Sequence, residues 1–222
     1  MSLYPIFLKL EGRKVLIVGG GSVAEQKIEG VLRSATDVTV ISPKVTDRIS
    51  RWAAEGRLKH MAIEYRAGAA QGYFLVIACT DSEPVNRAVY DEASESGAIV
   101  NAVDDPDYCN FYAPAVVNRG DFQIAISTGG ASPALAQRVR RELEQKYGEE
   151  YGPWTSWLGR TRAALRETLP RNENRKQVIR MLALGQPQPN PNDHGNNGGD
   201  DGRCKTQRLG SEGTRGAQGT SA

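Results

Sequence analysis

The chain has 222 residues, with 28 Lys or Arg against 26 Asp or Glu, so its formal net charge at pH 7 is only +2. That length suits one medium-sized domain with at most a small appendage, and the even charge balance argues against a protein that coats nucleic acid or an acidic membrane. The longest apolar stretches, such as 74–79, are too short to span a bilayer and the first residues carry no secretion signal, so we expect a soluble, cytoplasmic protein.

The first half of the chain alternates strand-like and helical segments. Strands are expected at 14–18, 37–42, 58–65, 73–80 and 98–104, and helices at 22–34, 44–56 and 82–96. Strands that alternate with helices at this spacing form a parallel sheet with right-handed crossovers. The predicted fold class is therefore α/β, a Rossmann-like parallel sheet with helices on both faces.

The pattern changes after residue 105. Two β-rich runs, 111–117 and 121–127, are joined by a turn at 118–120 and predict a hairpin. A helix is expected from the N-cap Ser132 to about residue 147, and two further helices at 153–169 and 172–184. From 185 to 222 the chain is dominated by Gly, Pro, Asn, Asp and Ser, a composition that predicts a disordered tail.

Cysteine and histidine are few and scattered. The cysteines Cys79, Cys109 and Cys204 make neither a disulfide framework nor a Cys-x-x-Cys metal motif. The histidines His60 and His194 have no partner at ligand spacing. The sequence therefore predicts no resident metal site.

A glycine-rich turn follows the first strand and leads directly into the first helix. It reads Gly19-x-Gly21-x-x-Ala24, in which Gly19 permits the tight turn, Gly21 lets the backbone approach a pyrophosphate and Ala24 allows close packing of helix on strand. The N–H groups of the helix start, at Ser22 and Val23, would face the phosphates. This context predicts a dinucleotide site; the alternative is a tight turn without a ligand.

The end of the second strand lacks one expected feature. It reads Ser42-Pro43-Lys44, without the Asp or Glu that usually binds the adenosine ribose of NAD. Ser42 is able to hydrogen-bond a ribose hydroxyl, and Lys44 is able either to accept a 2′-phosphate or to remain solvated. The motif alone leaves NAD and NADP both open.

Four segments together resemble a known family. They are MSLYPIFLKLEGRKVLIVGGGSVAEQK at the start, ACTD at 78–81, NAVDDPDYCNFYAPAVV at 101–117 and STGGASPALA at 127–136. In this order and spacing they are similar to the precorrin-2 dehydrogenase module of sirohaem synthases, which also occurs as a stand-alone dehydrogenase and, in yeast, as a bifunctional dehydrogenase and ferrochelatase. The resemblance covers about residues 1–184.

The resemblance implies an architecture, a cofactor and a partner. The domains would be a Rossmann domain at 1–112, a dimerisation segment at 113–147 and a small helical domain at 148–184, followed by the tail at 185–222. Members of the family use NAD⁺ although they lack the ribose carboxylate, and here Thr80 and Asp81 would join the cofactor-binding residues. We expect a homodimer whose interface includes the hairpin 111–127.

The resemblance also implies chemistry. Precorrin-2 loses a hydride to the nicotinamide and a proton to the protein, giving sirohydrochlorin. Asp104, after the fifth strand, is the residue that the family assigns to catalysis, with general base as its physically sensible role. The residues alone leave open that Asp104 or Asp105 merely caps the turn beginning at Pro106.

The substrate carries eight carboxylates and needs donors and positive charge. Candidate substrate-binding residues are Asn101, the anion-binding loop Ser127, Thr128, Gly129 and Gly130, and Arg138. Arg119, Arg140, Arg141 and Lys146 are further candidates, although arginines on a helix are often only solvated.

Three classes of function remain. The leading one is an NAD-dependent precorrin-2 dehydrogenase. The second is a chelatase that takes Fe²⁺ or Co²⁺ as substrate, alone or as a second activity of the same site. The third is a non-catalytic domain that senses the nucleotide, which would need neither an aspartate near the cofactor nor an anion-binding loop.

Overall fold

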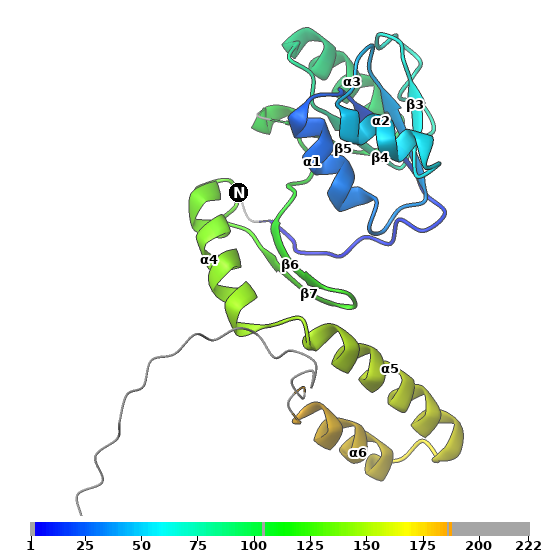
Figure 1. Ribbon diagram of the computed structural model, residues 1–222, viewed down its shortest axis with the longest axis vertical. Coiled ribbons are helices and arrows are strands. Elements are labelled where there is room, and N and C mark those ends of the chain that lie inside the picture. The colour runs from blue at the N-terminus through cyan, green and yellow to red at the C-terminus, as the bar shows by residue number, and fades with distance from the viewer. Residues whose placement is uncertain (1–2, 104, 186, 188–222) are drawn as a thin grey trace, which may run out of the picture.

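The computed structural model describes residues 3–103, 105–185 and 187. The first half of the chain forms a five-stranded parallel sheet with the order β3-β2-β1-β4-β5 (Figure 1). The strands are β1 (Lys14–Val18), β2 (Asp37–Ile41), β3 (Lys59–Met61), β4 (Leu75–Ala78) and β5 (Ile99–Ala102). The connecting helices are α1 (Ser22–Val31), α2 (Asp47–Ala54) and α3 (Glu83–Glu95). The Rossmann-like fold is thus confirmed.

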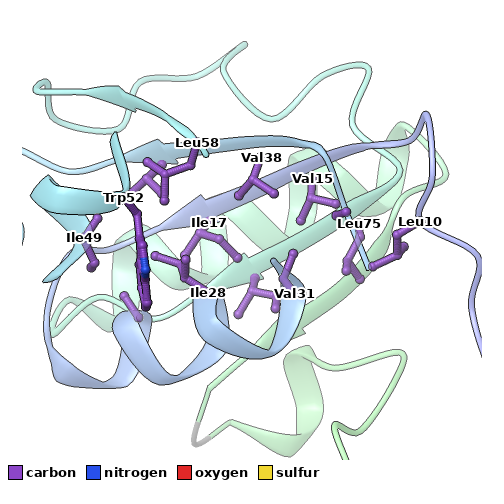
Figure 2. Close-up of a cluster of buried hydrophobic side chains, with 14 residues drawn as sticks. Leu10, Val15, Ile17, Ile28, Val31, Val38, Ile49, Trp52, Leu58 and Leu75 are labelled. Carbon is purple, nitrogen blue, oxygen red and sulfur yellow. The ribbon is translucent and has the colours of Figure 1, made fainter. Parts of the chain in front are cut away.

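Both faces of the sheet are buried, which is why its strands read as continuous apolar runs. One face packs under α1 and α2, where Ile17 and Val38 of the sheet meet Ile28 of α1 and Trp52 of α2 (Figure 2). The other face packs Val76 and Val100 against Val89 of α3. This two-sided core fixes the carboxyl ends of β1, β4 and β5 relative to one another.

Several predicted elements are shorter in the structure, and for two of them a side-chain contact accounts for the difference. The predicted strand 58–65 is paired only over β3, because the next segment turns away and is held by Glu92 of α3, which accepts from the Gly68 and Ala70 N–H groups at 3.0 and 2.8 Å. The predicted helix 44–56 begins only at Asp47, because the side chain of Thr46 caps it by accepting from the Ile49 N–H at 3.3 Å.

The hairpin consists of β6 (Ala115–Arg119) and β7 (Phe122–Ile126). Its turn is displaced from the predicted position 118–120, because Arg119 pairs with Phe122 and leaves only Gly120 and Asp121 between the strands. A positive φ of 67° at Gly120 suits such a two-residue turn. The hairpin packs against α4 (Pro133–Lys146), which Ser132 caps as predicted.

Two helices, α5 (Tyr151–Thr168) and α6 (Glu173–Ala183), complete the described chain. They pack against each other, and α5 contacts β7 (Figure 1). No described helix is both long and apolar enough to cross a membrane. The division into domains at 112, 147 and 184 stays a prediction, and the predicted tail lies outside the described residues apart from 185 and 187.

We expect the α1 face of the core to carry a large share of the stability. Ile28 is fully buried, and truncating such a side chain costs roughly 2–5 kcal/mol of unfolding free energy. Ile28→Ala should therefore lower the midpoint of urea unfolding strongly. Ile63→Ala is the matched control because Ile63 is 43% exposed. Equal midpoints for the two variants would contradict this description of the core.

Candidate active site

The glycine turn joins β1 to α1 at the carboxyl edge of the sheet. Gly19 has a φ of +129°, a conformation that favours glycine, and a Cβ there would lie 2.8 Å from the carbonyl carbon of Cys79. At Gly21, by contrast, a Cβ would meet nothing within 4 Å. Gly21 is the N-cap of α1, no side chain caps the helix there, and Ser22 and Val23 at the helix start are exposed.

This arrangement fits a dinucleotide. A pyrophosphate needs close access to backbone N–H groups at a helix N-terminus, and the open side of Gly21 provides it. Val23 is 42% exposed, whereas Ala24 is fully buried against the sheet. The small side chain of Ala24 lets the helix lie close to the strand, as the motif predicts.

Gly20 has a role that the motif did not reveal. A Cβ on Gly20 would collide with the carbonyl oxygen of Lys44 and lie 2.6 Å from Ser42 Oγ. The Gly20 carbonyl also accepts from the Thr46 N–H at 3.0 Å. The loop after β2 is therefore packed directly on the glycine turn, and only glycine fits between them.

The end of β2 contains no carboxylate in the structure either. Ser42 is buried, and its hydroxyl donates to the Lys44 carbonyl at 2.6 Å, while Pro43 and Lys44 are exposed. Arg48 of α2 lies 3.4 Å from Glu25 and 3.1 Å from Glu29. Lys44 and Arg48 are thus both exposed cations near the place where the ribose of a bound dinucleotide is expected, and Arg48 is paired with carboxylates.

Thr80 and Asp81 follow β4 beside the turn. The Thr80 hydroxyl lies 2.8 Å from the side-chain oxygen of Asn86, and the Thr80 carbonyl accepts from the Asn86 amide at 3.0 Å. Thr80 therefore fastens the start of α3, while Asp81 is exposed at the carboxyl edge. Their contact with a cofactor stays a prediction.

The loop after β5 is built around a short 3₁₀ turn, η1 (Pro106–Tyr108). Asp104 itself lies outside the described residues. Asp105 caps the turn by accepting from the Asp107 N–H at 3.2 Å. The capping role that the sequence left open between the two aspartates thus falls to Asp105.

Asn101 holds the returning part of this loop. Its amide donates to Cys109 Sγ at 3.2 Å and to the Phe111 carbonyl at 3.0 Å, and Asn101 is only 8% exposed. The sequence did not reveal this supporting role. Direct contact of Asn101 with substrate stays a prediction.

Two thiols lie beside these loops. Burial raises the pKa of Cys79 to about 12, against the opposing positive charge of Lys27. Burial likewise raises the pKa of Cys109, with a further increase from Asp105 and opposing effects of the Ala102 backbone and Lys27. Both thiols are therefore neutral at pH 7 and unsuited to act as nucleophiles or metal ligands.

The predicted anion-binding loop lies between β7 and α4. Gly129 and Gly130 both have positive φ, at 62° and 85°. The Gly129 N–H donates to Ser127 Oγ at 3.1 Å, and the Ser132 N–H donates to Thr128 Oγ1 at 3.1 Å. A Cβ on Gly130 would lie 3.8 Å from the ring of Tyr112, so the structure brings this loop next to the segment that follows η1.

The basic residues of this region differ in availability. Arg119 has a structural role, because its guanidinium donates to the backbone carbonyls of Tyr147 and Glu144 at 3.0 and 3.2 Å. Arg140 pairs with Glu144. Arg138 is mostly exposed and pairs loosely with Glu142 at 3.4 Å, so it remains available to an anion.

No group of three His, Cys, Asp or Glu side chains that would suit a metal ion occurs among the residues described.

Comparisons with known proteins agree with this geometry. Residues 6–115 match a family model described as putative NAD(P)-binding, and residues 119–146 match one described as sirohaem biosynthesis protein central. A solved structure titled "SirC, precorrin-2 dehydrogenase" superposes with a TM-score of 0.71 at 30% identity, covering 81% of this chain and 89% of that one. The chain belongs to the precorrin-2 dehydrogenase family.

Longer relatives share the same region. The siroheme synthase of Methylobacillus flagellatus is 36% identical over 176 residues, and that of Neisseria meningitidis serogroup C is 39% identical over 169 residues. These matches cover 79% and 76% of this chain but only 38% and 35% of the relatives. The chain thus spans little more than a third of the length of these relatives.

The glycine turn offers a test that separates packing from cofactor binding. Gly21→Leu should keep the wild-type melting temperature, because its φ of −81° is ordinary and its side is open, yet weaken NAD⁺ binding roughly 100-fold by occupying the pyrophosphate position. Gly20→Ala should instead lower the melting temperature, because overpacking costs about 1–3 kcal/mol. Unchanged NAD⁺ affinity in folded Gly21→Leu, measured by titration calorimetry, would refute the assignment of the site.

Proposed function

We propose that the protein oxidises precorrin-2 to sirohydrochlorin with NAD⁺ as hydride acceptor. The observation that carries the proposal is that the open glycine turn after β1 and the loop after β5 lie at the same edge of the sheet, on the two sides of β4, within the fold of a precorrin-2 dehydrogenase family member. Ligands of open α/β sheets bind at this edge. A nucleotide-sensing domain would not need a base beside the cofactor or an anion-binding loop.

The reaction divides into parts that different groups supply. The nicotinamide, when bound, accepts the hydride. The α1 N-terminus and the open side of Gly21 orient the dinucleotide. Asp104 takes the proton that leaves the macrocycle, and the loop 127–130 with Arg138 binds peripheral carboxylates. Asn101 and Asp105 support this arrangement by fixing the two ends of the loop that carries η1.

We propose NAD⁺ rather than NADP⁺ as the physiological acceptor. A 2′-phosphate binding site usually offers an arginine and further donors. Here Arg48 at the start of α2 is paired with Glu25 and Glu29. The Ser42 hydroxyl donates to the backbone carbonyl of Lys44. Among the described residues at the end of β2 and the start of α2, Lys44 is the only cation without a carboxylate partner that could bind a 2′-phosphate.

We further propose that the protein acts as a homodimer. A two-stranded sheet such as β6–β7 has two open edges and is marginal alone. Apolar side chains of the hairpin and of the helix packed on it are exposed, with Val116 of β6 at 37% and Leu135 of α4 at 41%. A two-fold partner that covers this surface would bury both.

Asp104→Asn tests the catalytic assignment. The variant should bind NAD⁺ normally but turn over precorrin-2 roughly 10²–10⁴-fold more slowly, the usual effect of losing a positioned base. The matched control is Asp107→Asn, which changes an exposed carboxylate of η1. A loss of only a few-fold would show that the base lies elsewhere. Supplying sirohydrochlorin and Fe²⁺ to the same variant tests whether this carboxylate also serves metal insertion.

Light scattering tests the dimer. At low micromolar concentration the wild type should have about twice the 24.1 kDa mass of the chain. Val116→Asp should shift the mass toward one chain, because a charge would be buried in the interface, whereas Val178→Asp on α6 should not. A fully active wild-type monomer would overturn the proposal.

A further inference from the structure

The two flanks of α1 face different parts of the sheet. Glu25 lies on the flank toward α2, because its carboxylate accepts from the Thr46 hydroxyl at 2.6 Å and lies 3.4 Å from Arg48. Lys27 follows two residues later and is therefore turned about 200° around the helix. It lies on the opposite flank, toward β4 and β5.

The packing of the core supports this orientation. The helix α2 packs on β3, on one side of β1 in the strand order, whereas β4 lies directly on the other side of β1. The strand order places β4 and then β5 beyond β1 on that second side. The flank of α1 that carries Lys27 therefore overlies the strands that lead to Cys79 and to residue 104.

The side chain of Lys27 also points along the helix toward the cofactor end. Side chains of an α-helix tilt toward its N-terminus, and α1 begins at the carboxyl edge of the sheet, directly after the glycine turn. Consistent with this, the positive charge of Lys27 opposes the rise in pKa of both Cys79 and Cys109. Cys79 directly follows β4, and Cys109 Sγ donates to the Ala102 carbonyl at the end of β5 at 3.1 Å.

Lys27 differs from the other cations near α1 in its partners. Arg33 pairs with Glu29 at 3.7 Å, and Arg48 pairs with both Glu25 and Glu29. Over 3–103 and 105–185, by contrast, no carboxylate forms an ion pair with the half-buried Lys27. A half-buried ammonium group gains most from an anionic ligand, because its own hydration is already reduced.

We propose that Lys27 is a substrate-binding residue that contacts a peripheral carboxylate of the tetrapyrrole at the β4–β5 side of the cofactor site. The inference rests on the proposed function, which supplies a substrate with eight carboxylates. A lysine suits this task because its compact charge and flexible stem accept a carboxylate without demanding a planar, two-point geometry. Together with the loop 127–130, Lys27 would hold the macrocycle at two separate places.

The test compares three variants in two measurements. Lys27→Met removes the charge, Lys27→Arg keeps it, and Lys59→Met makes the same change on the exposed edge strand β3, far along the sheet from β5. The measurements are sirohydrochlorin binding, followed by its absorbance, and anaerobic precorrin-2 kinetics. NAD⁺ affinity and melting temperature are recorded for every variant.

Lys27→Met should raise both the sirohydrochlorin Kd and the KM for precorrin-2 roughly 10- to 100-fold, the effect of losing one charge-assisted contact. Its NAD⁺ affinity and melting temperature should stay near wild type. Lys27→Arg should recover most of the affinity, and Lys59→Met should behave as wild type.

The negative outcomes are distinct. If the wild type neither binds sirohydrochlorin nor oxidises precorrin-2, the proposed function and this inference both fail. If the wild type does both and Lys27→Met matches Lys59→Met, only the inference about Lys27 fails. A fall in kcat with unchanged tetrapyrrole affinity would also overturn it, because Lys27 would then act on the catalytic base instead of the substrate.

Discussion

The close approach of three backbone segments at the carboxyl edge of the sheet is the constraint on which the site depends. Gly19 lies against the Cys79 carbonyl and Gly20 against the Lys44 carbonyl, so the turn after β1 is packed between the loops after β4 and β2. A side chain at either position would push these loops apart. Because Gly21 is the one member of the triplet with an open side, the same packing leaves the turn accessible to a pyrophosphate at Gly21.

The rest of the candidate site is arranged around this fixed edge. Asn101 ties the loop after β5 back to its own strand, and Asp105 caps the turn within that loop. Tyr112, just beyond the loop, lies near Gly130 of the proposed anion-binding loop. A substrate bound at residue 104 would thus meet elements of two different parts of the fold, the parallel sheet and the hairpin with its helix.

Local pattern was enough to predict the elements that carry their own signal. The strand β1, the glycine turn and the N-cap Ser132 were predicted correctly, because continuous apolar runs, glycine spacing and Ser-Pro pairs act within a few residues. The length of β3 was not predictable in this way. The segment after β3 is held by Glu92, which accepts a hydrogen bond from the Tyr65 hydroxyl. The two residues are 27 positions apart in the chain, so no local sequence pattern predicts their contact.

The roles of particular side chains were harder to predict for the same reason. Arg119 looked like a candidate for substrate carboxylates, yet its guanidinium donates to the Glu144 and Tyr147 carbonyl groups at the end of α4, 25 and 28 positions further along the chain. The sequence pattern did not single out Gly20 or Lys27, because the surroundings of both residues depend on which strands lie beside β1. The order of strands in a sheet is a long-range property, and it decides which flank of α1 overlies β4 and β5.

We propose that this sheet edge couples precorrin-2 oxidation to reduction of NAD⁺. The most direct measurement is an anaerobic single-turnover reaction of the wild-type protein with precorrin-2, following NADH at 340 nm and sirohydrochlorin by its own absorbance. We predict one NADH and one sirohydrochlorin for each precorrin-2 consumed, with NADP⁺ a much poorer acceptor. Sirohydrochlorin formation that is independent of either nucleotide, or no oxidation when both are supplied, would contradict the account.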